Sequence, residues 1–209
     1  MVCRIFFVIL LNLLSIEDSM TAENFHNSFR KLLNVEGGFS DHPDDNGGPT
    51  NFGVTQRTYN YWRRLEELPQ QSVKKITVLE ASRLYKRLFW NVVKGDLLPI
   101  GLDHIIFDYA VNSGPKRAIK ALQRELGTSA DGIIGPKTRG LIKDIYHEDD
   151  KVEKIILAIM KKRLSWLHRL SDWKVFGRGW TNRVNTVRKE ALEMLDNGEQ
   201  LALKLEGGK

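Results

Sequence analysis

The sequence has little cysteine and no recognisable arrangement of metal ligands. Its 209 residues include one cysteine, Cys3, so no intrachain disulfide can form. Cysteine usage therefore does not distinguish an oxidising from a reducing compartment. Its five histidines do not have the spacing of metal ligands. The sequence therefore predicts a fold that needs no disulfide and that holds neither a metal ion nor a cofactor.

Motifs for nucleic-acid recognition are also missing. The chain has no helix-turn-helix signature, no zinc-finger spacing and no aromatic platform for single strands, so we expect no nucleic-acid partner. Its net charge is +6, from 32 basic and 26 acidic residues. Such an excess favours association with polyanions, including acidic polymers of the bacterial envelope, although a generally basic solvated surface explains it equally well.

Long hydrophobic runs are missing as well. The longest, residues 5–16, is interrupted by Asn12 and Ser15 and falls short of the roughly 20 residues that span a membrane. Its length matches the core of a signal peptide, but its positive flank is weak and no clean cleavage site follows. Three interpretations of residues 1–19 stay open: an export signal or weak membrane tether, which we favour, a buried core helix, or a leader before a start at Met20.

The rest of the sequence is typical of a soluble, mainly helical protein. It is 42% hydrophobic and 28% charged, which suits one domain with or without a small appendage. Thr77 and Glu80 have the spacing of a capping box, and residues 39–55 are typical of a loop or small hairpin. Apolar spacing predicts helices over residues 21–36, 56–67, 77–92, 101–113, 115–126, 150–170 and 180–196, with a shorter helix that starts at 136.

Glu36 is the strongest candidate for a reacting group. An apolar stripe runs from Phe25 to Leu33, and Glu36, eleven residues after Phe25, returns to the same helix face. It also lies in the last predicted turn before Gly37, where the negative end of the helix dipole opposes ionisation. We therefore expect a raised pKa for the Glu36 carboxyl, as a general acid near neutrality requires, whereas an isolated glutamate there would simply point to solvent.

The loop after Glu36 carries further polar candidates. Asp44 and Asp45 lie in a glycine-bounded loop, an exposed setting in which aspartate stays ionised. A protonated glutamate beside a charged aspartate is the paired-carboxylate arrangement of glycosidases. Thr50 and Thr55 add hydroxyls that could hold a water molecule against an aspartate.

This region resembles a known signature. The sequences VEGGF at residues 35–39 and PDDNGGPTNFGVT at residues 43–55 resemble glycoside hydrolase family 108, lysozyme-like N-acetylmuramidases of which many are phage endolysins. The resemblance implies that Glu36 is the catalytic acid and Asp45 the second carboxylate. Thr50 takes the place of a threonine in the similar T-even phage lysozymes. The resemblance to family 108 also implies a lysozyme-like helical fold with a small loop or hairpin around the active site.

The resemblance continues toward the C-terminus. Residues 107–114, 121–138 and 179–183 are similar to the peptidoglycan-binding segment and closing motif of these enzymes, which implies bacterial peptidoglycan as the partner. We therefore divide the chain into an apolar segment 1–19, a catalytic segment 20–100, a helical peptidoglycan-binding segment 101–196 packed on it, and a loose tail 197–209.

Two further sets of side chains have alternative interpretations. Asp108 and Asn112, four residues apart on one helix face, either line the glycan cleft or bond to neighbouring backbone. The five tryptophans could stack on sugar rings, but aromatic residues at helical spacing are more often core. They are Trp62, Trp90, Trp166, Trp173 and Trp180.

Together these expectations describe hydrolysis of the β-1,4 bond between N-acetylmuramic acid and N-acetylglucosamine. Glu36 would protonate the glycosidic oxygen, and Asp45, helped by Thr50, would position the attacking water, which implies inversion. Thr55 is a second candidate for the hydroxyl, and Asp44 a candidate substrate contact. Rival interpretations are a lytic transglycosylase that uses Glu36 alone, a noncatalytic wall-binding protein and a membrane-disrupting basic protein.

The expected setting follows from the same resemblance. We expect a monomer that lyses bacterial walls from the periplasm or the wall itself, or that waits in the host cytoplasm before lysis. Residues 5–16 would give it a transient membrane association.

Overall fold

The computed structural model describes residues 23–33, 49–146 and 148–206, and the side chains among them up to residue 198. Helices dominate this part of the chain, which confirms the predicted mainly helical class. They are residues 23–33, α2 (Gln56–Leu65), α3 (Val78–Tyr85), α4 (Leu102–Ser113), α5 (Pro115–Glu125), α6 (Pro136–Ile145), α7 (Asp149–Leu167) and α8 (Trp173–Glu206). Short helical turns lie at Val73–Lys75, Lys86–Trp90 and Gly95–Leu97.

The strands described are limited to one small hairpin. Strands β1 (Thr50–Asn51) and β2 (Val54–Thr55) are antiparallel, with Thr50 opposite Thr55. The two residues between them, Phe52 and Gly53, have φ angles of 52° and 72°. Two consecutive positive φ angles are typical of the tight turn that matches the twist of a two-residue hairpin. The expected small hairpin therefore exists at the end of residues 39–55.

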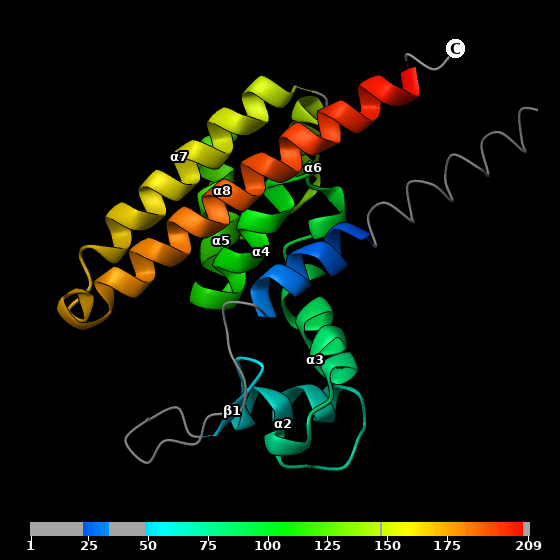
Figure 1. Cartoon of the computed structure of the whole chain (residues 1–209), viewed down its shortest axis with the longest axis vertical. Coiled ribbons are helices and arrows are strands. Elements are labelled where there is room, and N and C mark those ends of the chain that lie inside the picture. Colours follow the sequence, from blue (N-terminus) through cyan, green and yellow to red (C-terminus); the bar gives the residue numbers. More distant parts are fainter. Residues whose placement is uncertain (1–22, 34–48, 147, 207–209) are drawn as a thin grey trace, which may run out of the picture.

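Apolar side chains form two clusters that meet at α4. The first cluster joins helix 23–33, the hairpin, α2 and α3, and it includes Phe107 of α4. The second joins α4 to α8 and includes Ile105 and Ile106 of the same helix. Figure 1 shows the corresponding small lobe around α2 and α3 and the larger lobe of α4 to α8, with helix 23–33 between them. Because α4 belongs to both clusters, the predicted boundary between a catalytic segment 20–100 and a peptidoglycan-binding segment 101–196 stays a prediction.

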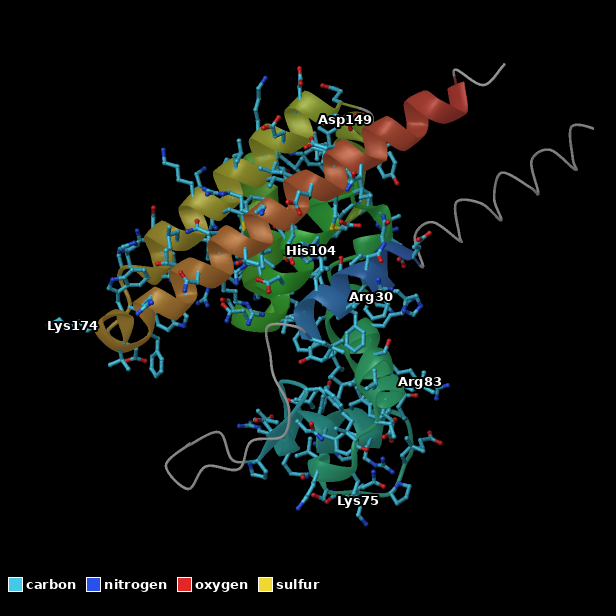
Figure 2. All side chains as sticks on the ribbon, viewed as in Figure 1. Arg30, Lys75, Arg83, His104, Asp149 and Lys174 are labelled. Carbon is cyan, nitrogen blue, oxygen red and sulfur yellow. The ribbon has the colours of Figure 1, made fainter. Side chains whose placement is uncertain are left out.

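Helices α7 and α8 run antiparallel along the large lobe (Figure 1). Asp149, which begins α7, and Lys174, near the start of α8, lie at opposite ends of the pair (Figure 2). Helix α8 continues to Glu206, where the sequence predicted a loose tail from residue 197. Gly198 lies inside this helix and does not end it. It packs closely on Ile100, since a Cβ at Gly198 would lie 3.2 Å from Ile100 Cγ2. No described helix is long and apolar enough to cross a membrane.

The region of α3 agrees with its predicted start and departs from its predicted continuation. Thr77 Oγ1 accepts a hydrogen bond from the Glu80 N–H, and the Glu80 carboxylate accepts one from the Thr77 N–H, so the capping box is confirmed. The chain then forms a π-type turn over Lys86–Trp90 instead of a regular α-helix. The wider turn rotates the apolar face, so Trp90 is buried while Val92 is 46% exposed.

Candidate functional site

The predicted catalytic carboxylates lie outside the described residues, but the elements on either side of them are described. Glu36, Asp44 and Asp45 fall within residues 34–48, and their roles stay predictions. Helix 23–33 precedes this segment and buries Phe25, Phe29 and Leu32 in the first cluster. The hairpin follows it and buries Val54 in the same cluster. The segment with the candidate carboxylates therefore begins and ends on elements that share one core.

Tyr85 of α3 contacts both of these elements. Its ring lies 5.6 Å from the ring of Phe29 on helix 23–33. Its hydroxyl donates a hydrogen bond of 2.9 Å to the carbonyl of Phe52 in the hairpin turn. A buried tyrosine that packs its ring and uses its hydroxyl fixes two elements at once, so α3 sets the spacing between helix 23–33 and the hairpin.

Thr50 and Thr55 lie opposite each other across the hairpin, which places both side chains on one face. The Thr55 hydroxyl is engaged: it accepts a hydrogen bond of 3.2 Å from the Thr58 N–H as the N-cap of α2 and lies 3.0 Å from Thr58 Oγ1. Thr50 makes no side-chain hydrogen bond with any described residue. Of the two candidate hydroxyls, Thr50 is therefore the one that the fold leaves for another partner.

A polar network, which the sequence did not reveal, supports α2 beneath the hairpin. Arg63 is 6% exposed and pairs with Glu80 of α3 at 3.0 Å. Tyr59 accepts a hydrogen bond of 2.8 Å from Arg63 and donates one of 3.1 Å to Glu80. Burial opposes ionisation of Glu80, but hydrogen bonds from Thr77 and Tyr59 outweigh it and lower the Glu80 pKa. The network fixes α2, and with it the cap at Thr55, against α3.

Asp108 lies inside the large lobe between two arginines. Its oxygens accept hydrogen bonds of 2.6 Å from Arg163 on α7 and 2.7 Å from Arg183 on α8, and the residue is 3% exposed. Burial opposes ionisation, but the two guanidinium groups hold the pKa of Asp108 below its usual range. Asn112, one turn later and exposed, accepts a hydrogen bond of 3.1 Å from Arg163. Both residues thus bond side chains of other helices, and their contact with a glycan stays a prediction.

The Asp131–Thr138 motif forms the connection between α5 and α6. Buried Gln123 holds it: the side-chain amide donates to Asp131 at 2.7 Å, to the Ile133 carbonyl at 2.9 Å and to Thr138 at 3.2 Å. The Gln123 carbonyl accepts a hydrogen bond of 2.8 Å from the Gly132 N–H. The motif residues that sequence reasoning associated with wall binding are therefore engaged in shaping this turn.

The tryptophans divide between core and surface. Trp62 and Trp90 are buried in the first cluster, as aromatic residues at helical spacing usually are. Trp166, Trp173 and Trp180 are partly buried against the second cluster and keep part of their rings available. Among the residues that the structure describes, no group of three or more histidine, cysteine, aspartate or glutamate side chains could hold a metal ion.

Comparisons with known proteins place this arrangement in a family. The profile described as Glycosyl hydrolase 108 matches residues 29–114, and the one described as Predicted Peptidoglycan domain matches residues 117–185. The solved structure of Brucella abortus SagA is 38% identical, with a TM-score of 0.72 over 83% of this chain and 97% of that chain. The chain belongs to glycoside hydrolase family 108. No curated protein matches it.

The family 108 match ends where the structure changes direction. It covers helix 23–33 from Phe29, the hairpin, α2, α3 and α4, and it stops at Gly114. Gly114 has a φ of 89°, and the chain turns there from α4 into α5. The peptidoglycan-domain match then takes in α5, α6, α7 and the first part of α8. The chain is thus a glycoside hydrolase joined to a peptidoglycan-binding domain, which supports peptidoglycan as its substrate.

Proposed function

We propose that this protein hydrolyses the β-1,4 bond between N-acetylmuramic acid and N-acetylglucosamine in bacterial peptidoglycan. The observation that carries the proposal is that one chain joins a family 108 segment, residues 29–114, to a peptidoglycan domain, residues 117–185. Helix α4, which ends the first segment, belongs to both hydrophobic clusters, so the two segments share a core. A wall strand bound by the second segment would therefore lie near the first.

In the proposed mechanism Glu36 donates its proton to the glycosidic oxygen while positive charge develops on the sugar ring. Asp45 remains ionised and, with the Thr50 hydroxyl, positions the attacking water on the opposite face. The Thr50 hydroxyl, which bonds no described residue, supports its assignment to this role, since the hydroxyl of Thr55 is engaged in the α2 cap. An inverting reaction requires roughly 6.5–9.5 Å between the two carboxyl groups, and it is the stereochemistry that we propose.

The proposal extends to the setting in which the enzyme works. We propose a monomer that acts as an endolysin, reaching the wall from the host cytoplasm or acting in the periplasm. The apolar run over residues 5–16 supports a transient association with a membrane on that route. The net charge of +6 supports attraction to acidic envelope polymers.

Digestion of purified peptidoglycan by the wild type and by Glu36→Gln tests the proposal. The wild type should release fragments with N-acetylmuramic acid at the new reducing end, identified by borohydride reduction and mass spectrometry. Glu36→Gln should lower turnover by about 10²-fold or more, because a general acid contributes at least that much. The matched control is Glu153→Gln, since Glu153 is an exposed glutamate on α7 and its substitution should leave turnover unchanged.

Three results would contradict the proposal. Products lighter by one water, with an anhydro end, would identify a lytic transglycosylase. Reducing ends of N-acetylglucosamine would identify cleavage of the other glycosidic bond. Equal activity of Glu36→Gln and the wild type would remove Glu36 from the chemistry.

A further inference from the structure

A groove of about 780 Å³ lies between α5 and α7 in the peptidoglycan-domain half of the chain. Its walls come from the end of α4, the length of α5, the second half of α7 and Arg169 just after α7. We call it the basic groove, because seven of its lining side chains are basic and one, Glu125, is acidic. The basic side chains are Lys116, Arg117, Lys120, Arg124, Lys162, Arg163 and Arg169.

Only part of this positive charge is paired with acidic side chains of the described residues. Lys162 pairs with Glu125 at 2.6 Å, and Arg163 pairs with Asp108. The other five basic side chains form no direct ion pair with a residue that the structure describes, although the charge of Lys120 acts on nearby Asp131. A concave surface with charge of one sign concentrates field lines and attracts ligands of the opposite sign. The basic groove is therefore suited to a ligand with several negative charges.

The floor of the basic groove is built from fixed side chains. Arg163 is 1% exposed, its guanidinium carbon lies 4.7 Å from the centre of the Tyr109 ring, and its Nε donates no hydrogen bond to a described residue. A buried guanidinium N–H without a partner is a donor that a ligand oxygen can satisfy. At the rim, the guanidinium carbon of Arg117 lies 4.1 Å from the centre of the Trp166 ring, which limits the freedom of both side chains.

The N-terminus of α5 opens into the same groove. Gly114, Pro115 and Lys116 line it, and α5 begins there without a side-chain cap. An uncapped helix start carries partial positive charge and favours an anion. A Cβ built at Gly114 would have no atom within 4 Å, so the approach to this helix end is open. The helix dipole thus acts in the same sense as the basic side chains of the groove.

We propose that the basic groove binds the peptide stems of peptidoglycan through their carboxylates. The inference rests on the proposed function, because it takes peptidoglycan as the substrate. The glycan backbone is uncharged once its lactyl group is amide-linked to a stem, whereas each stem carries several carboxylates together with small apolar side chains. Arginine and lysine satisfy the carboxylates, and the half-buried side chains of Pro115, Ala121 and Trp166 offer apolar surface to the methyl groups.

Calorimetric titration of the full chain with a soluble stem tests this assignment. The probe is the tetrapeptide L-alanyl-γ-D-glutamyl-meso-diaminopimelyl-D-alanine, and its comparison is the same peptide with amidated carboxyl groups. The triple variant Lys116→Gln, Lys120→Gln, Arg169→Gln should weaken tetrapeptide binding by about tenfold or more, because three charge-assisted contacts are lost. The control triple Lys143→Gln, Lys154→Gln, Lys189→Gln removes the same charge outside the groove, at exposed positions, and should change binding by less than about twofold.

Several outcomes would overturn the assignment: equal binding of the groove triple and the wild type, equal binding of the amidated peptide, or displacement of the tetrapeptide by a chitin hexasaccharide. Binding is read without turnover, so the titration can be repeated in Glu36→Gln. A stem that binds there while Glu36→Gln still cleaves peptidoglycan would contradict the proposed mechanism and leave the groove assignment standing. A wild type that cleaves peptidoglycan normally but does not bind the tetrapeptide would overturn the groove assignment and leave the proposed mechanism standing.

Discussion

At the scale of single residues, Asp103 is an acid buried where its charge has little support. It is 0% exposed at the start of α4, and its Oδ1 accepts a hydrogen bond of 2.6 Å from the His104 N–H. Burial outweighs this bond and those from the Gly101 backbone and the Asn24 side chain, and it raises the pKa of Asp103 to about 8. In the unfolded chain the same carboxyl has its usual pKa of 3.8. Between these two values the folded state binds one proton more, so the free energy of unfolding falls as the pH rises.

Asp103→Asn should therefore stabilise the protein in a pH-dependent way. The asparagine keeps the acceptor for the His104 N–H and removes the carboxyl that must stay protonated. We expect a gain of at least about 1 kcal/mol at pH 8.5, because each unit of pKa shift corresponds to about 1.4 kcal/mol. The gain should shrink toward pH 4, where the carboxyl is protonated in the folded protein and half-protonated in the unfolded chain. Urea unfolding of both proteins at pH 4.5 and pH 8.5 measures the difference.

The control for this experiment is Asp144→Asn, an exposed aspartate on α6 whose substitution should have the same small effect at both pH values. An Asp103→Asn variant that gains equally at both pH values, or more at pH 4.5, would show that Asp103 is ionised in the folded protein.

Asp108 shows what sequence reasoning could and could not predict about a single residue. Its spacing from Asn112 correctly placed both on one helix face, because that spacing depends only on helix geometry. Its actual partners, Arg163 and Arg183, lie 55 and 75 residues away in the sequence. Nothing in a local pattern shows that three helices bring these charges together, so the buried ion pairs could not have been predicted.

At the scale of elements, the start signals were the most predictable feature. The capping box at Thr77 and the prolines that begin α5 and α6 act within one turn, so the sequence alone reveals them. The π-type turn at Lys86–Trp90 and the continuation of α8 past Gly198 depend on packing against other elements. Tertiary contacts override local preference at such places.

The hairpin supplies an element-scale prediction that separates two similar threonines. Thr55→Val removes the N-cap of α2 while keeping the branched shape, and it should lower the free energy of unfolding by about 1 kcal/mol. Thr50→Val should leave stability nearly unchanged, because its hydroxyl bonds no described residue, yet lower turnover on peptidoglycan as its water loses a partner. Thermal unfolding and turnover, measured on both variants well below the unfolding temperature, give the two readouts.

The two variants serve as controls for each other. The reverse pattern, with turnover lost in Thr55→Val at full stability and normal turnover in Thr50→Val, would transfer the proposed role to Thr55. Normal turnover in both would remove the hydroxyl from the mechanism.

At the scale of the whole molecule, the order of the segments was predictable from the sequence and their coupling was not. The family signature and the wall-binding motif lie in separate stretches, so two functional segments could be expected from the sequence alone. The sequence did not show that α4 belongs to both hydrophobic clusters. Phe107 is buried against Phe25, Tyr85 and Trp90, with ring centres 5.5–6.3 Å away, while the next turns of α4 pack against α7 and α8.

This shared helix predicts that the two lobes unfold together. If α4 cannot leave one cluster without leaving the other, the slowest-exchanging amides of α2 and of α7 should open with the same free energy in the wild type. Phe107→Ala removes the α4 side chain from the small lobe and should cost that lobe about 3–5 kcal/mol. Hydrogen exchange read by mass spectrometry should then show α2 and α3 opening before α7, whereas Phe176→Ala, at a 54% exposed phenylalanine, should change neither lobe. Separate opening of the two lobes in the wild type, or equal opening of both lobes in Phe107→Ala, would mean that α4 does not couple them. The large lobe could then unfold locally without disturbing the small lobe.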